Sequence, residues 1–272
     1  MKQNNGSGKA ILLDFTECIG CGACEDACER EHNLPADPPE DELNHKNYTI
    51  VLKEKGQFYR RMCMHCLEPT CASVCPVTAL EKTDLGAVIY HEDKCIGCRY
   101  CMMACPFQIP KYEWGKAVPV IRKCVMCFDR VKAGGETACA WVCPTGACRF
   151  GERDRLLALA HRRIEAFPNR YVDYVYGEEE VGGTGVLMLS GVPFEDLGFQ
   201  MDLGYTPLPE LTWTVMSKIP NIVITGGLLL GGISWIIHRR MDIERENLEQ
   251  KASVEPGADA KHVKPPDEEG QG

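Results

Sequence analysis

The chain has 272 residues, the length of one large domain or two ordinary ones, and 44% of its residues are hydrophobic and 25% are charged. This ordinary composition excludes a chain that is disordered throughout. The formal net charge of −9 argues against nucleic acid as a partner, because nucleic-acid-binding surfaces are basic.

The chain begins with polar residues and two strand candidates. Residues 1–10 contain no apolar run and no twin arginine, so we expect no signal peptide there. Residues 10–15 (AILLDF) are expected to form an edge strand, and residues 48–52 a second short strand. Between them, residues 29–47 form a proline-rich acidic insertion, in which we expect His32 to be solvated.

The last 124 residues contain no cysteine and begin with a helix candidate. Residues 154–167 have the apolar periodicity of an amphipathic helix, with Asp154 as its N-cap and Pro168 at its end. Residues 186–189 (VLML) predict a strand between glycines. We expect the whole segment 151–210 to pack on a partner subunit.

A long uncharged run near the C-terminus predicts a membrane-spanning helix. Residues 219–237 carry no charge and are numerous enough to cross a bilayer. Trp213 and Trp235 bracket the run as interface anchors would, and the basic residues 238–240 end it. A buried core helix is the alternative, but these features favour a transmembrane helix over residues 211–240.

The charges on either side of this run predict its orientation. Four basic residues follow it closely, Arg239, Arg240, Arg245 and Lys251, whereas only Lys218 precedes it. The positive-inside rule therefore places the C-terminal tail in the cytoplasm and the cysteine-containing part on the periplasmic side of a bacterial inner membrane. The acidic tail, residues 241–272, is expected to be disordered.

Cysteine is the unusual feature of this sequence. All 17 cysteines lie in the first 148 residues, and sixteen of them form four groups of four. The groups are Cys18, Cys21, Cys24 and Cys28; Cys63, Cys66, Cys71 and Cys75; Cys95, Cys98, Cys101 and Cys105; and Cys124, Cys127, Cys139 and Cys143. Groups one and three have the spacing C-x2-C-x2-C-x3-C, while groups two and four widen the middle gap to four and eleven residues.

This spacing is typical of [4Fe–4S] ligation. Three closely spaced cysteines present thiolates to three irons of one cluster, and the fourth points away to complete a neighbouring cluster. Pro76, Pro106 and Pro144 follow three of the fourth cysteines and turn the chain away. The sequence therefore predicts four [4Fe–4S] clusters, with the leftover Cys148 as a small buried hydrophobic residue.

Other uses of the cysteines fit less well. Structural zinc takes two cysteine pairs per ion and does not explain the third and fourth members of each group. Disulfides between cysteines two apart are strained, and a chain of this length does not need so many. Heme attachment needs the order CxxCH, whereas His65 lies inside its pair and is expected to hydrogen-bond near a cluster. Lys94, Arg99 and Lys111 are expected to lie beside clusters, where they either raise a cluster potential or are plain surface residues.

Spacing alone leaves the pairing of the groups open. A compact group is expected to pair with a widened one. Either groups two and three are nested inside groups one and four, or group one pairs with two and group three with four.

The motifs CIGCGAC, CMHCLEPTC, CIGCRYCMMACPFQIPKY, ACAWVCPTGACRFG and YGEEEVGGTGVLMLSGVP resemble those of a known family. They are similar to the iron–sulfur β subunit of membrane-bound respiratory formate dehydrogenase and to the iron–sulfur subunit of hydrogenase-2-type uptake hydrogenases. The resemblance implies an α+β fold of two ferredoxin-like, bis-[4Fe–4S] domains within residues 1–150, plus one C-terminal transmembrane helix. The inner ferredoxin would comprise residues 62–110, and the outer one residues 1–61 with 111–150.

The resemblance also implies the nested pairing and four ligand sets, here named sites A to D. Site A is Cys18, Cys21, Cys24 and Cys143; site B is Cys28, Cys124, Cys127 and Cys139; site C is Cys63, Cys66, Cys71 and Cys105; site D is Cys75, Cys95, Cys98 and Cys101. One departure is that Glu29, not proline, follows Cys28, which is expected to leave that turn less rigid.

The function implied is an electron-transfer subunit of a respiratory oxidoreductase, with no catalytic residues of its own. Its partners would be a molybdopterin or tungstopterin catalytic subunit and an integral membrane cytochrome b or quinone-reactive subunit. The eleven-residue gap of group four and the expected absence of a signal favour the formate enzyme, whereas LSGVPFEDL resembles the hydrogenase subunit. We expect export in the folded state beside a twin-arginine partner. A hydrogenase or another molybdopterin oxidoreductase is the alternative complex. A self-contained ferredoxin-dependent enzyme, a redox sensor or a structural metal-binding protein are the alternatives from other classes.

Overall fold

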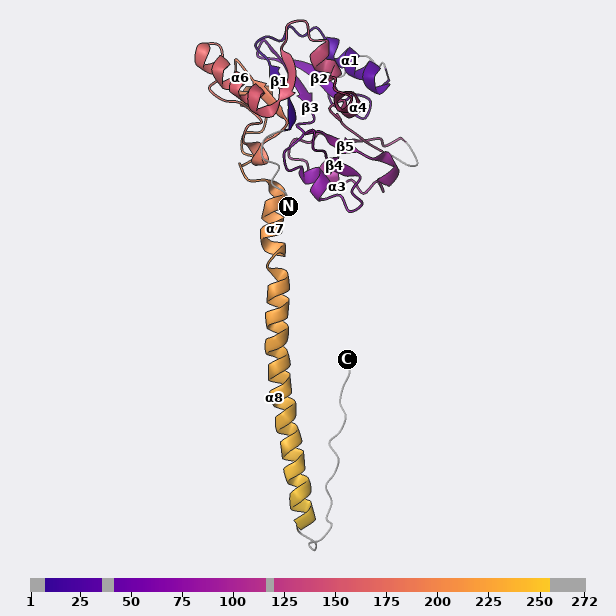
Figure 1. The fold of residues 1–272 in the computed structure, drawn as a ribbon, viewed down its shortest axis with the longest axis vertical. Helices are drawn as coiled ribbons and strands as arrows, with labels where there is room; N and C mark the ends of the chain where they lie inside the picture. The colour runs from indigo at the N-terminus through magenta and orange to yellow at the C-terminus, as the bar shows by residue number, and fades with distance from the viewer. Residues whose placement is uncertain (1–7, 36–41, 116–119, 255–272) are drawn as a thin grey trace. The chain divides into compact units, whose positions relative to one another are not determined.

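The computed structural model describes residues 8–35, 42–115 and 120–254 (Figure 1). Part of the predicted acidic insertion and the end of the predicted tail therefore lie outside the described residues. The chain divides into two compact units, Met1–Trp213 and Thr214–Gly272, and each is described by itself.

A three-stranded sheet organises the first unit. Strand β1 (Lys9–Asp14) lies in the middle, antiparallel to β8 (Cys148–Glu152) and parallel to β9 (Val186–Leu189). We expected an edge strand over residues 10–15, and this was wrong. The run AILLD is apolar on both faces, so both faces of β1 are buried and a central position suits it.

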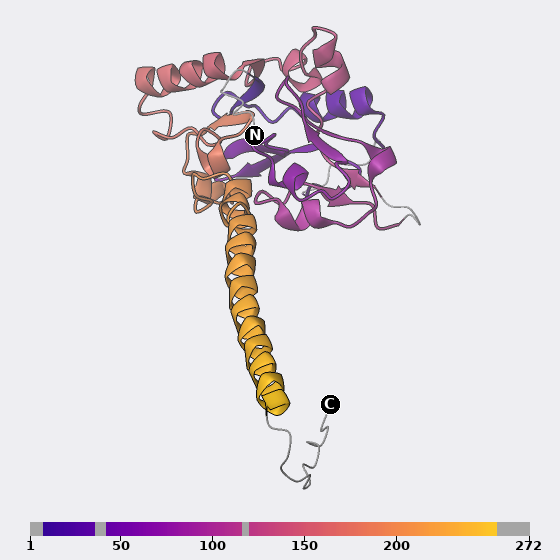
Figure 2. The ribbon, with the colours of Figure 1, turned by 60° about the horizontal axis from the view of Figure 1, so that its bottom comes forward.

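The two faces of β1 belong to two different cores. Leu12 packs with Leu156 and Ile164 of α6 (Arg153–Ala166), which covers one face of the sheet (Figures 1 and 2). Ile11 and Leu13 face the opposite core, which contains several of the cysteines. The amphipathic helix was thus predicted correctly, although it begins after Glu152 and not after Asp154. Its apolar face packs on this chain's own sheet and is not available to a partner subunit.

Short hairpins and short helices make up the cysteine-rich region. The antiparallel hairpins are β2 (Thr49–Glu54) with β3 (Gln57–Met62), β4 (Leu80–Lys82) with β5 (Val88–Tyr90), and β6 (Lys111–Tyr112) with β7 (Ile121–Arg122). The helices are α1 (Ala23–His32), α2 (Thr70–Ser73), α3 (Tyr100–Ala104), α4 (Phe128–Lys132) and α5 (Ala138–Trp141). Single 3₁₀ turns occur at Glu92–Lys94, Glu180–Gly182 and Phe194–Leu197. This mixture confirms the predicted α+β class.

The packing of these helices relates distant parts of the sequence. Helix α1 packs on α5, and α2 packs on α3. Because α1 and α5 carry cysteines of groups one and four, and α2 and α3 those of groups two and three, the first group folds beside the last and the two middle groups fold beside each other.

The C-terminal part is helical. Helices α7 (Leu208–Met216) and α8 (Ile219–Val254) include a stretch, Leu208–Lys251, that is long and apolar enough to cross a membrane. Pro220 lies in the first turn of α8, where a missing N–H removes no helical hydrogen bond. We expected residues 241–272 to be disordered, and this was wrong as far as Val254. The sequence MDIERENLEQK consists mostly of strong helix formers and contains no glycine or proline, so the helix continues beyond the apolar run.

Candidate iron–sulfur sites

The four cysteine groups begin with loops of the same backbone shape. The residue before the second cysteine has a positive φ in every group: Gly20 at 68°, His65 at 49°, Gly97 at 69° and Met126 at 58°. A left-handed residue costs a side-chain-bearing position roughly 1–2 kcal/mol, so four repeats of it indicate a common structural requirement. Such a turn directs successive backbone N–H groups to one side of the loop, where they can bind an anion.

The third cysteine of every group is the second residue of a short helix. Cys24 lies on α1, Cys71 on α2, Cys101 on α3 and Cys139 on α5. The widened gaps of groups two and four are therefore insertions before the helix, and in group four the insertion contains α4. The insertions leave the placement of the third cysteine unchanged.

The turn after the fourth cysteine differs between group one and the others. Where proline follows the cysteine, the turn ends in a left-handed residue: Thr78 at 51°, Gln108 at 55° or Gly146 at 67°. Where Glu29 follows Cys28, helix α1 continues to His32 instead. The departure noted in the sequence thus produces a longer helix.

The extension of α1 also places His32 beside a cysteine. Its Nε2 lies 3.6 Å from Sγ of Cys127, and burial lowers the pKa of the half-buried imidazole. Our expectation that His32 is solvated was wrong. It failed because residues 29–32 belong to α1 and not to the acidic insertion.

Cysteines that are far apart in the sequence lie close together in the structure. One pocket is lined by Cys18, Cys21, Cys24 and Cys143 together with Cys148, and another by Cys75, Cys95, Cys98 and Cys101. The pKa of Cys28 is raised by burial and by the nearby sulfurs of Cys124, Cys139 and Cys127. The pKa of Cys66 is raised by burial and by Cys63, Cys105 and Cys71. The two pockets contain the cysteines expected for sites A and D. The neighbours of Cys28 are those expected for site B, and the neighbours of Cys66 are those expected for site C.

Backbone N–H groups donate to sulfurs of the described cysteines. In site A, the N···Sγ distance from Cys148 to Cys143 is 3.4 Å. In site B, the distances are 3.3 Å from Met126 to Cys124 and 3.5 Å from Ala138 to Cys127. In site D, they are 3.2 Å from Ala79 to Cys75 and 3.4 Å from Gly97 to Cys95. Hydrogen bonds of this kind stabilise thiolates that bind a metal, and they tune its potential.

Burial makes free thiolates unfavourable at these positions. It raises the pKa of Cys101 and of Cys127 to about 11, and that of Cys71 to about 12. Iron would replace the thiol protons and supply the missing positive charge, so the donor set fits a metal cluster. Among the described residues, no three His, Cys, Asp or Glu side chains are close enough to share one metal ion. A [4Fe–4S] cluster needs a wider set, because each of its thiolates binds a different iron.

His65 is buried and leaves a polar atom without a partner. Its Nδ1 accepts the backbone N–H of Val88 at 2.9 Å, so Nε2 carries the proton of the neutral ring. Burial and the nearby Lys123 and Lys82 lower its pKa, which keeps the ring neutral. Nε2 has no hydrogen-bond partner within the described part of the chain. An unpartnered donor beside Cys66 is what an acceptor such as a cluster sulfur would satisfy.

The sequence analysis missed the buried Lys123 and the half-buried Lys82. Nζ of Lys82 donates to the carbonyls of His65, Cys66 and Gly86, and Nζ of Lys123 donates to those of Val88 and Cys124. Lys94 and Arg99, which we had singled out, are exposed. Proximity to a cysteine in the sequence did not distinguish the lysines that bond to backbone carbonyls from the exposed cations. No other sequence signal marks Lys82 or Lys123.

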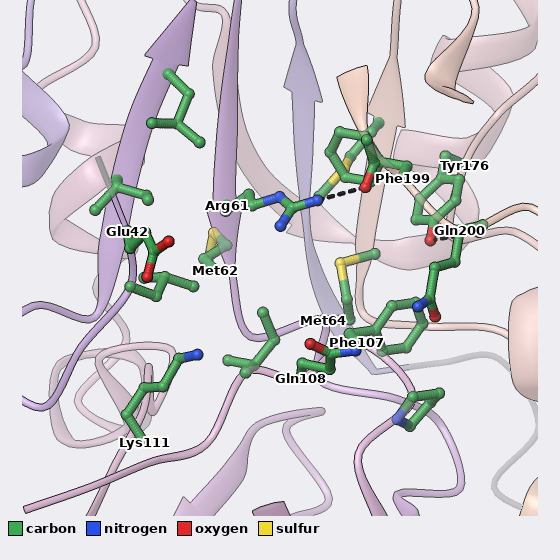
Figure 3. A pocket seen from close by; sticks show the side chains of 17 residues that line it. Glu42, Arg61, Met62, Met64, Phe107, Gln108, Lys111, Tyr176, Phe199 and Gln200 are labelled. Atoms are coloured by element: carbon green, nitrogen blue, oxygen red, sulfur yellow. Dashed lines mark hydrogen bonds between the residues drawn. The ribbon is translucent and has the colours of Figure 1, made fainter. Parts of the chain in front are cut away.

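The cavity of Figure 3 is separate from these sites. It measures about 340 Å³ and is lined by Arg61, Lys111 and Phe199 among others, but by none of the cysteines. Nη2 of Arg61 donates to the carbonyl of Gly198, which lies on its wall. Lys111, the third cation singled out from the sequence, therefore faces this cavity and not a cysteine-lined pocket.

Comparison with known proteins identifies relatives along most of the chain. Two family models, both described as 4Fe-4S dicluster domain, match residues 17–79 and 55–153. A protein of Nitratidesulfovibrio vulgaris is 40% identical over 253 residues, which cover 87% of this chain and 68% of the relative. The hydrogenase-2 operon protein HybA of Escherichia coli O157:H7 is 37% identical over 69% of this chain and 71% of its own. The formate dehydrogenase iron–sulfur subunit of Haemophilus influenzae is 31% identical over 87% of this chain and 82% of its own.

Proposed function

This chain belongs to the 4Fe-4S dicluster ferredoxin family, and from that premise we propose that it relays electrons through four [4Fe–4S] clusters between a catalytic subunit and a membrane-bound acceptor. Relatives of this chain include a formate dehydrogenase iron–sulfur subunit and the hydrogenase-2 operon protein HybA. The clusters would be held by sites A to D. They would supply one-electron redox chemistry, while this chain positions them and sets their potentials.

Interactions between cysteines of different sites support the proposal, because they link site A with B, site B with C, and site C with D. Burial raises the pKa of Cys24 in site A, and Cys139 of site B raises it further. In the same way Cys63 of site C adds to the effect of burial on Cys124 of site B. Cys101 of site D is likewise one of the sulfurs that act on buried Cys71 of site C. The order is therefore A, B, C, D, which suits stepwise transfer.

The two ends of the proposed row reach the surface, while site B is covered. Cys21 of site A and Cys98 of site D are exposed, whereas all four cysteines of site B are buried. Exposed apolar side chains stand beside both ends, namely Ile19 at 59% and Ile96 at 64% exposure. Exposed apolar groups around a buried redox path favour docking of partner subunits at the ends.

Two catalytic partners are candidates. The eleven-residue gap of group four, which contains α4, favours a formate dehydrogenase. The higher identity to HybA, 37% against 31% for the Haemophilus subunit, favours a hydrogenase. Isolation of the intact complex, followed by reduction with formate or with hydrogen, distinguishes them, since only the true substrate reduces the clusters.

We further propose that α8 anchors the protein in a bacterial inner membrane as a single span. The apolar part of Leu208–Lys251 supports this, since none of its most apolar 18-residue window is buried within the structure. The excess of basic residues after residue 237 supports a cytoplasmic C-terminus, with the cluster-bearing unit on the periplasmic side. Export in the folded state beside a twin-arginine partner is the route that this orientation favours.

Iron and acid-labile sulfide analysis of the purified complex, with EPR of the reduced protein, tests the relay. We expect about sixteen irons attributable to this chain, four for each of four clusters. Binding of zinc in place of iron, or iron for a single cluster, would refute it.

A further inference from the structure

Arg60 is a fully buried cation in the middle of the cluster region. It lies on β3, is only 5% exposed, and lines the pocket formed by the cysteines of site A. Its Nε donates to Oγ1 of Thr49 at 2.6 Å, and its Nη1 donates to Sγ of Cys148 at 3.4 Å. Both of these partners are neutral in their ordinary protonation states.

Within the described residues, no carboxylate forms an ion pair with Arg60. Glu25 is near enough to sense its charge, but Oε1 of Glu25 accepts the backbone N–H of Val51 at 3.0 Å. A buried charge without a counter-charge is strongly unfavourable. The fold therefore needs negative charge close to Arg60 that the carboxylates do not provide.

Sulfurs of the proposed sites A and B lie close to this guanidinium. Arg60 lines the same pocket as Cys18 and Cys24, and Cys148, which accepts from its Nη1, lies 3.9 Å from Sγ of Cys139. Cys24 belongs to site A and Cys139 to site B. Arg60 is thus positioned between two of the proposed clusters, which carry net negative charge when bound by four thiolates each.

We propose that Arg60 is the counter-charge of the clusters in sites A and B, and that it raises their reduction potentials above those they would have without it. The proposal rests on the proposed function, since it concerns clusters in those two sites. Each cluster gains one negative charge when it accepts an electron, so a fixed cation stabilises the reduced form more than the oxidised form. Net charge and burial are among the factors that set the potential of such clusters.

Cys148 acquires a role in this arrangement. Its Sγ lies 3.9 Å from Sγ of Cys139 and accepts from Arg60, and the side chain is 6% exposed. Cys148 and Thr49 both accept hydrogen bonds from the guanidinium of Arg60 and so orient it. Cys148 is therefore a positioning residue and not a cluster ligand. Its replacement should leave the number of clusters unchanged.

Arg61 provides a matched control. It is the next residue of β3, but its Nη2 donates to the carbonyl of Gly198 and its guanidinium stacks over Phe199, 5.5 Å from the ring centroid. It therefore faces the cavity of Figure 3. Arg61→Gln removes the same charge from the adjacent position without removing it from sites A and B.

The experiment is an EPR-monitored redox titration of the intact, cluster-loaded complex. Arg60→Gln should lower the equilibrium constant for reduction of two of the four clusters by about tenfold, which is 59 mV for a one-electron couple. Arg60→Lys should keep most of the wild-type potential, because it keeps the charge. Arg61→Gln should leave all four potentials unchanged, and Cys148→Ala should retain the full iron content.

The outcomes separate this proposal from the proposed function. A wild-type protein without four clusters refutes the proposed function itself. Four clusters whose potentials are the same in wild type and in Arg60→Gln refute the role of Arg60, as does an equal shift in Arg61→Gln. If Arg60→Gln fails to load iron, Arg60→Lys decides the question. Full iron content with both potentials close to wild type supports the role of the charge. Loss of iron in Arg60→Lys as well assigns Arg60 to packing alone and overturns the proposal.

Discussion

Substitution of Gly20 tests the loop geometry of site A. The φ of 68° at Gly20 costs any residue with a Cβ roughly 1–2 kcal/mol. A Cβ at this position would also lie 2.3 Å from the ring of Phe58, far inside van der Waals contact. Overpacking of this kind costs typically about 1–3 kcal/mol, so Gly20→Ala should destabilise the first unit by about 2–5 kcal/mol in all.

Gly97 is the equivalent residue in site D and is the matched comparison. Its φ of 69° is nearly the same, but its Cβ would lie 3.2 Å from the hydroxyl of Tyr112 and 3.9 Å from a carbon of its ring. Gly97→Ala should therefore show the backbone cost and little of the steric cost. His65 and Met126 have side chains at the corresponding positions of the other two groups, with similar backbone angles, so the conformation itself tolerates a side chain.

The assay is thermal loss of the cluster absorbance in the intact protein, together with iron content. For a unit of this size, 1 kcal/mol shifts the midpoint by roughly 2–4 °C, so Gly20→Ala should melt about 2–12 °C below Gly97→Ala. In a double-mutant cycle, Phe58→Ala should recover the steric part of the loss caused by Gly20→Ala. Equal destabilisation of the two glycine variants, or no recovery with Phe58→Ala, would refute the reasoning.

Three further predictions follow from the proposed sites and anchor. Cys28→Ser should perturb the same EPR signal as Cys124→Ser, because both belong to site B; a signal shared with Cys63→Ser instead would contradict the nested pairing. Removal of residues 214–272 should release the cluster-bearing unit from the membrane with its iron retained, and its persistence in the membrane fraction at high salt would exclude α8 as the anchor. Protease added to intact spheroplasts should digest residues 1–210 and spare the C-terminal tail, whereas digestion of the tail alone would reverse the proposed orientation.

Local patterns in the sequence were sufficient for several features. The cysteine spacing specified four groups, because ligands that bind one cluster must lie close together along the chain. The periodicity of residues 154–167 and the uncharged run 219–237 predicted helices, because a helix repeats every 3.6 residues whatever it packs against. The α+β class was implied by the resemblance of the cysteine motifs to a known family.

Other features depended on contacts between residues far apart in the sequence. The closeness of groups one and four arises where α1 packs on α5, which spacing alone did not determine. The central place of β1 depends on β9, more than 170 residues later in the chain. Nothing in the sequence distinguishes Arg60 from Arg61, since strand geometry points neighbouring side chains to opposite faces and only the packing decides which face meets the cysteines. The sequence by itself therefore indicated which chemistry this protein carries, whereas the tertiary structure decided which cysteine groups lie side by side and which cation lies beside them, because both depend on how distant elements pack.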